Sequence, residues 1–240
     1  LGLQGTFTKL EKMMLLAAMP LVKKYQPTAR TAFVLSTTKG NIHALAQGLP
    51  AESLLTNLGH KLQQHLGIPN VPIVLSHACV SGVLAVSVAK RLIQMGSYDN
   101  ALVLAGDALS EFVVSGFHSF QAIDAVSCRP FDKDRAGVSL GEAAAALYLS
   151  TEKQTIRIAG EGSINDANHI SGHSRTGEGL YQSIVAACKE ADMQAEAIDF
   201  ISAHGTATPY NDEMEAIAFD RLGLKDVPVN SLKGFYGHTL

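Results

Sequence analysis

The sequence has few cysteines, little net charge and no long apolar run, and each shortage excludes a class of protein. Its three cysteines, Cys79, Cys128 and Cys188, are odd in number and far apart, which excludes a disulfide framework and a metal-ligand spacing. Lys and Arg total 19 against 22 Asp and Glu, a balance that argues against a nucleic-acid partner. No apolar stretch approaches the ~20 residues of a membrane helix. We therefore expect a cytoplasmic protein without a membrane span.

Apolar residues make up 47% of the chain and charged residues 17%, which is typical of a well-buried globular protein. Short apolar strands alternate with amphipathic helices, and this pattern predicts an α/β fold with a buried, mostly parallel sheet. Strands are expected over 31–36, 71–75, 101–105, 143–149, 155–160, 199–203 and 227–230; helices are expected around 10–21 and over 80–94, 178–191 and 211–222. A linker-like point near 150–155 predicts two α/β halves, 1–152 and 153–240.

Cys79 lies where an apolar strand gives way to small residues and then to a helix. Such a strand–turn–helix junction exposes a nucleophile at a helix N-terminus. The free N–H groups and the helix dipole there favour a thiolate and can hold an oxyanion. The alternative interpretation is that Cys79 is a small buried hydrophobic residue, as free cysteines often are.

Two histidines are predicted to follow strands in the second half. His204 stands in a Gly/Thr loop after the strand over 199–203, and His238 follows a strand that ends on Lys233. Ligands gather at the carboxyl ends of strands in open α/β sheets. A cysteine with two histidines can form a thiol-based acyl-transfer site, although each histidine alone is more often structural.

Several ordered motifs make the chain resemble the β-ketoacyl synthases, the condensing enzymes of fatty-acid and polyketide synthesis. The motifs are Ser76-His77-Ala78-Cys79-Val80-Ser81-Gly82, Cys128-Arg129-Pro130-Phe131-Asp132, Asp166-Ala167-Asn168-His169, His204-Gly205-Thr206-Ala207-Thr208 with Asp212 and Glu215, and Lys233 with Gly237-His238. The resemblance implies the thiolase-like fold, with two similar halves, mixed and mostly parallel sheets, and five layers in the order αβαβα.

The resemblance also implies a mechanism and partners. Cys79 would take an acyl chain from the phosphopantetheine arm of an acyl carrier protein, and His204 and His238 would decarboxylate a malonyl thioester. No cofactor or metal is implied. The partner would be an identical chain, or a related synthase subunit in a heterodimer. The two histidines favour an elongating enzyme; the acyl length and the pathway (fatty acid, polyketide or polyene) stay open.

Other residues receive supporting roles. Lys233 would be a charge beside the site that can pair with Glu215. Glu215 and Asp212 can support the chemistry, or they can be ordinary first-turn acids of a helix with Asn211 as its N-cap. Asp166 is expected to be an architectural hydrogen-bond partner. Cys128 is expected to be structural, Cys188 to be a core residue on the inward face of a helix, and Phe117 and Phe120 to lie in a loop.

The resemblance covers only part of the family's pattern. The chain begins on Leu1 and ends two residues after His238, so we expect the fold's first strand and helix, and a C-terminal glycine-rich loop with the second oxyanion donor, to be missing. An alternative function is a non-catalytic partner subunit of the chain-length-factor type, although such partners lose the cysteine. A third hypothesis is that the chain is a plain α/β ligand-binding module.

Overall fold

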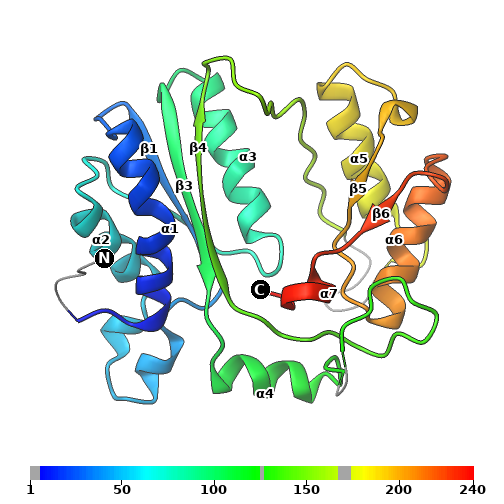
Figure 1. The fold of residues 1–240 in the computed structure, drawn as a ribbon, viewed down its shortest axis with the longest axis horizontal. Coiled ribbons are helices and arrows are strands. Elements are labelled where there is room, and N and C mark those ends of the chain that lie inside the picture. Colours follow the sequence, from blue (N-terminus) through cyan, green and yellow to red (C-terminus); the bar gives the residue numbers. More distant parts are fainter. Residues whose placement is uncertain (1–5, 125–126, 167–173) are drawn as a thin grey trace. The chain divides into compact units, whose positions relative to one another are not determined.

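A computed structural model describes residues 6–124, 127–166 and 174–240 (Figure 1). Its elements in chain order are α1 (Lys9–Tyr25), β1 (Thr31–Ser36), the 3-10 turns η1 (Ile42–Leu45) and η2 (Pro50–Ser53), α2 (Leu55–Leu66), β2 (Ile73–Leu75), α3 (Ser81–Gln94), β3 (Asn100–Asp107), α4 (Glu111–Ser119), β4 (Ala143–Ser150), α5 (Glu178–Glu190), η3 (Ala195–Ala197), β5 (Ile201–Ser202), α6 (Pro209–Arg221), β6 (Val229–Asn230) and α7 (Lys233–Tyr236).

The chain forms two compact units. The first consists of Leu1–Gly116, Gly141–Glu152 and Thr239–Leu240, and the second of Phe117–Leu140 and Lys153–His238. The division into halves at residues 152 and 153 stays a prediction.

The first unit is built on a four-stranded sheet in the order β2-β1-β3-β4. β1 pairs with β2 and β3 in parallel, with Val34 opposite both Ile73 and Val103, whereas β4 runs antiparallel to β3. The sheet is therefore mixed and mostly parallel, as predicted. All six residues of β1 are buried, which explains why this strand reads as a continuous apolar run.

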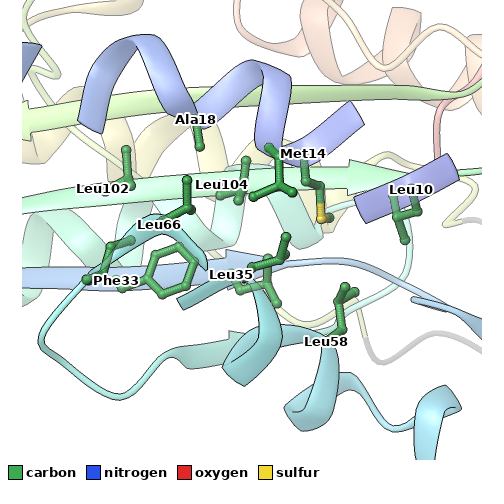
Figure 2. Packing of buried hydrophobic residues seen from close by; sticks show 12 residues of the cluster. Leu10, Met14, Ala18, Phe33, Leu35, Leu58, Leu66, Leu102 and Leu104 are labelled. Atoms are coloured by element: carbon green, nitrogen blue, oxygen red, sulfur yellow. The ribbon is translucent and has the colours of Figure 1, made fainter. Parts of the chain in front are cut away.

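Alternate residues of the strands face two different cores. Phe33 and Leu35 of β1 pack with Leu102 and Leu104 of β3 against α1 and α2 (Figure 2). The intervening residues, among them Val34 and Val103, pack against α3 on the other face of the sheet (Figure 1). This alternation is the period of two that a pleated strand imposes.

Helix α2 was not predicted from the sequence. Its apolar residues Leu58, Leu62 and Leu66 recur every four residues and are buried against the sheet. Gly67 ends the helix in the left-handed conformation, at φ 66°. The spacing and the glycine together are a helix signal.

The second unit contains the parallel pair β5-β6 and the helices α5 and α6 (Figure 1). The prediction of a strand over 155–160 is wrong: the segment is not a strand, and no strand among the described residues pairs with it. Residues 155–159 are exposed, and the chain meets α5 only after them, where a Cβ at Gly160 or Gly162 would collide with a backbone carbonyl of that helix. An apolar run without a neighbouring strand has no ladder to join.

Candidate active site

Cys79 lies in the short connection between β2 and α3, exposed and two residues before the first residue of α3. Ala78, the residue before it, has a φ of 43°, the left-handed region that a residue with a Cβ rarely adopts. Strained backbone of this kind persists only where surrounding contacts hold it. The predicted strand–turn–helix junction is confirmed, and Cys79 is not the buried residue of the alternative interpretation.

Ser81 locks this turn from the first position of α3. Its hydroxyl donates to the Ala78 carbonyl at 2.6 Å and accepts the His77 N–H at 2.7 Å. The N–H of Ser81 itself also bonds the Ala78 carbonyl, at 3.2 Å. A Cβ at Gly82 would lie 3.9 Å from the Cβ of Ala105, an ordinary contact, so the turn does not depend on a glycine at this position.

The second unit brings His204 and His238 together. Their ring centroids are 5.5 Å apart, with the planes at 88°. His204 follows β5, while His238 follows α7 and donates its backbone N–H to the Ser139 carbonyl at 2.7 Å. The ring of Phe117 meets His238 edge-on at 6.0 Å. Phe117 was expected in a loop, but it belongs to helix α4.

His238 is 3% exposed, and its surroundings keep its imidazole neutral. Burial, helped by the positive charge of Lys233, lowers the pKa of His238 to about 4. A neutral imidazole carries one N–H donor and one acceptor nitrogen, so it can donate a hydrogen bond to an oxygen without bringing a charge.

This pKa predicts a pH dependence of stability. Unfolded, His238 binds a proton below pH ~6.5, whereas the folded protein leaves it neutral down to about pH 4. The unfolded state then binds more protons in this window, so the free energy of unfolding falls as the pH is lowered through it, by about 3 kcal/mol in total. Urea unfolding from pH 7 to 4 measures this loss.

A variant separates the His238 contribution from that of other groups. In His238→Asn the loss between pH 6.5 and 4 should shrink by about 3 kcal/mol relative to the wild type. His43→Asn, at an exposed position, should leave the wild-type curve unchanged. If the free energies of unfolding of the wild type and His238→Asn fell in parallel as the pH is lowered, the assignment of His238 as a buried neutral imidazole would be refuted.

Lys233 holds His204 from the start of α7. It does not end a strand as predicted, because β6 stops at Asn230 and Lys233 begins the four-residue helix. Its ammonium donates to the His204 carbonyl at 2.8 Å and lies 3.4 Å from the Nδ1 of the same residue. Lys233 thus places a positive charge directly beside the imidazole pair.

Glu215, on α6, holds the backbone of the same loop by hydrogen bonds. Its carboxylate accepts the N–H groups of His204 at 2.8 Å and Gly205 at 2.6 Å, and an amide hydrogen bond from Asn211 at 2.9 Å. The carboxyl is 3% exposed, and its burial raises its pKa although these hydrogen bonds act in the opposite direction. Gly205 has a φ of 45°, so the loop needs its glycine here.

Asp212, one turn earlier on α6, joins two segments of the second unit. Its carboxylate accepts the N–H of Phe131 at 2.7 Å and that of Ala207 at 3.2 Å. Both residues have left-handed backbone, with φ of 62° and 61°. Arg135 lies 3.9 Å from the same carboxylate. A single buried carboxylate therefore holds two strained backbone positions.

The N-terminus of α6 corrects another expectation. Its N-cap is Thr208, followed by Pro209, and not Asn211 as predicted. Asn211 is buried inside the first turn, where its amide donates to the carboxylates of both Asp212 and Glu215. The two acids are thus more than first-turn charges that complement a helix dipole.

Removing the Asp212 carboxylate should destabilise the fold strongly. Asp212→Ala leaves two buried N–H groups without an acceptor, and we expect it to lower the free energy of unfolding by about 3 kcal/mol. Denaturant unfolding measures the loss. Asp226→Ala, at an exposed aspartate, is the control and should change stability by less than about 0.5 kcal/mol. Equal small losses in both variants would contradict the role of Asp212.

Ser231 was not predicted from the sequence as a site residue, and it connects the His204 loop with Lys233. Ser231 is 7% exposed, and its hydroxyl lies 2.8 Å from the Gly205 carbonyl, to which it donates, and 3.4 Å from the Lys233 N–H. Its position in the sequence, directly after a strand and two residues before Lys233, could have indicated this role. A small hydroxyl residue at such a point can bond two neighbouring loops.

The remaining candidates are Asp166, Cys128 and Cys188. Asp166 is exposed and sits against Gly179 at the start of α5, while residues 167–169 of its motif are outside the described residues. Cys128 is buried beside the Thr206 carbonyl, and burial raises the pKa of its thiol, so its structural assignment is confirmed. Cys188 is only half-buried and lines an open groove of about 470 Å³, so its core assignment is wrong.

Within the described residues, no helix is both long and apolar enough to cross a membrane.

Comparisons with known proteins agree with the motifs. Residues 60–155 match the family "Beta-ketoacyl synthase, N-terminal domain", and residues 156–240 match "Beta-ketoacyl synthase, C-terminal domain". The chain is 32% identical to the ketoacyl synthase alpha subunit of the tetracenomycin polyketide synthase from Streptomyces glaucescens, over 77% of this chain and 48% of the relative. It is 31% identical to 3-oxoacyl-[acyl-carrier-protein] synthase 2 of Vibrio cholerae, over 72% of this chain and 47% of the relative.

Solved structures show the same likeness. The ketosynthase ApeO in complex with its chain length factor ApeC, from Xenorhabdus doucetiae, matches with a TM-score of 0.88 and 28% identity, covering 97% of this chain and 64% of that one. The chain spans about half the length of the curated relatives it matches. Together, residues 60–240 match the two consecutive domains of one enzyme family. The chain therefore belongs to the beta-ketoacyl synthase family and has its thiolase-like α/β fold.

Proposed function

We propose that the protein is a condensing enzyme that joins an acyl chain to a malonyl unit, both delivered by acyl carrier protein. The Cys79 thiolate attacks the acyl thioester, forms a new thioester and releases the carrier thiol, which takes up a proton. A malonyl thioester then loses CO₂ to give an enolate. The enolate carbon attacks the Cys79-bound acyl carbonyl, and the Cys79 thiolate leaves as the β-ketoacyl thioester forms.

The observation that carries the proposal is the imidazole pair of His204 and His238, of which His238 is buried and neutral. Decarboxylation builds negative charge on the malonyl thioester oxygen, and hydrogen-bond donors placed in advance stabilise such a charge. His238, with its pKa of about 4, supplies an uncharged donor at neutral pH. His204 lies beside it, with its backbone fixed by Lys233 and Glu215. We propose His204 and His238 as the catalytic pair, with Lys233 and Glu215 as positioning residues.

The geometry of the β2–α3 turn supports Cys79 as the nucleophile. The thiol is exposed, beside a strained Ala78 and next to the N-terminus of α3. Unpaired N–H groups at a helix start favour a thiolate and can bind the oxyanion of a tetrahedral intermediate. Asp212 and Asp166 would act only through the backbone that they hold.

The proposed partners follow from the relatives. The Vibrio cholerae relative is named a 3-oxoacyl-[acyl-carrier-protein] synthase, and two structural neighbours are ketosynthases with a chain length factor. We propose acyl carrier protein as the substrate carrier, and an identical chain or a related synthase subunit as the dimer partner. No cofactor is needed for the steps above.

A second candidate is a non-catalytic partner subunit, which the likeness to ketosynthase–chain length factor complexes favours. The two proposals differ in Cys79, which only an active subunit needs. An assay of the intact protein with acyl and malonyl carrier-protein thioesters separates them. In a catalytic subunit, assayed alone or with its partner subunit, Cys79→Ala abolishes formation of the β-ketoacyl thioester. In a non-catalytic subunit, activity appears only when a second synthase subunit is added, and it survives Cys79→Ala.

A further inference from the structure

We infer that Asp107, a residue outside every motif above, is a positioning residue for Cys79. It would act through the loop of residues 37–40, which holds the end of strand β2 just before the Cys79 turn. The inference rests on the proposed role of Cys79 as nucleophile. It assigns to the Asp107 carboxylate the role of fixing the turn that contains Cys79. All residues in the argument belong to the first unit.

Asp107 ends β3 and is 4% exposed. Its carboxylate accepts a hydrogen bond from the Thr37 hydroxyl at 2.8 Å, from the Thr38 N–H at 2.9 Å and from the Lys39 N–H at 3.1 Å. The Thr37 hydroxyl in turn accepts the Gly40 N–H at 3.1 Å. Hydrogen bonds to an ionised carboxylate are about twice as strong as neutral ones, so one buried side chain fixes the whole loop.

The loop is bonded to β2 at two consecutive residues. Thr37 donates its N–H to the Leu75 carbonyl at 3.2 Å, and Ser76 donates its hydroxyl to the Thr38 carbonyl at 3.3 Å. Leu75 is the last residue of β2, and Ser76 is the first residue of the connection that contains Cys79. The hydrogen bonds thus run without a gap from Asp107 to a point three residues before Cys79.

The turn needs this support because it stores strain. Ala78 has left-handed backbone, and Ser81 holds the turn at His77 and Ala78. The 37–40 loop holds the chain just before them, at Ser76. Without the Asp107 bonds, Leu75 remains paired with β1, but the loop that anchors Ser76 is no longer fixed. Cys79 then loses its alignment with the α3 N-terminus, on which its reactivity depends.

The test is the alkylation of Cys79 by iodoacetamide, followed by peptide mass spectrometry across a range of pH and well below the unfolding temperature. In Asp107→Ala, we expect alkylation at neutral pH to slow about tenfold, with the pH–rate profile displaced upward by about one unit. Asp107→Asn keeps one carbonyl oxygen for the loop and should fall between Asp107→Ala and the wild type. It also serves as the deciding variant if Asp107→Ala does not fold.

Two controls exclude indirect effects. Asp99→Ala removes a carboxylate just before the other end of β3, where it pairs with Arg30, and Leu62→Ala weakens the core between α2 and the sheet. Both should keep the wild-type profile. A wild-type profile in folded Asp107 variants, or the same displacement in Leu62→Ala, would overturn the inference. If carrier thioesters never acylate wild-type Cys79, the proposed function fails, and the alkylation profile still decides the role of Asp107.

Discussion

Cys79→Ser is expected to abolish acyl loading and condensation, reducing both rates by at least about 10³-fold. A serine hydroxyl is a far weaker acid than a thiol, so a helix N-terminus that favours a thiolate does not ionise it. The enzyme would retain its fold, because Cys79 is exposed and the substitution changes one atom. Transfer of a radiolabelled acyl group from the carrier protein to the enzyme measures the loading step directly.

The chain provides matched controls in its other two cysteines. Cys128→Ala removes a buried thiol whose pKa burial raises, and Cys188→Ala removes a half-buried one. Both variants should load the acyl group within about twofold of the wild type, since only the thiolate is nucleophilic. Loading that survives in Cys79→Ser and disappears in Cys128→Ala would move the nucleophile to the second unit and refute the proposed mechanism.

His204→Ala and His238→Ala should each lower malonyl decarboxylation by about 10²- to 10³-fold and leave acyl loading on Cys79 detectable. Removing one donor to a developing oxyanion has this magnitude in other enzymes. Loading requires the thiolate and its turn, whereas decarboxylation requires the imidazole pair, so the two steps should separate. Release of labelled CO₂ from malonyl carrier protein measures decarboxylation, and acyl transfer to the enzyme measures loading.

A third histidine variant is the control for this comparison. His43→Ala, at an exposed position of the first unit, should leave both steps at the wild-type rate. Equal loss of loading and decarboxylation in His204→Ala or His238→Ala would indicate a folding defect. Normal decarboxylation in both variants would contradict the proposed role of the pair.

The parts that were predictable from the sequence are those whose pattern is local. The span of β1 over residues 31–36 follows from a run of β-branched and apolar residues that is buried on both faces. The exposed junction at Cys79 follows from a strand, small residues and a helix in succession. His204 is placed by the strand before it and by the Gly/Thr loop after it.

The failures concern contacts with distant segments. Residues 155–160 have the composition of a strand, yet no described strand lies beside them to complete a ladder. Lys233 was expected at a strand end, but the backbone turns into α7 directly after Ser231. Phe117 reads as a loop residue because Gly116 and the polar residues around it hide the helical period of α4.

The buried carboxylates show the same limit most clearly. Asp212 was assigned a first-turn helix position, which the structure bears out, but its bond to Phe131 depends on a segment 81 residues earlier in the sequence. Asp107 gave no signal, since an aspartate at the end of a strand is common in loops. Its significance comes from the 37–40 loop that it holds, about seventy residues earlier in the chain.

Whether Cys79 carries the acyl group is decided by peptide mapping of the intact protein after brief incubation with an acyl carrier-protein thioester and no malonyl donor. We expect one acyl mass per active chain, on the peptide that contains Cys79, and its disappearance when malonyl carrier protein is added. An acyl mass on another residue, or none on any peptide of an enzyme that still condenses, would contradict this expectation.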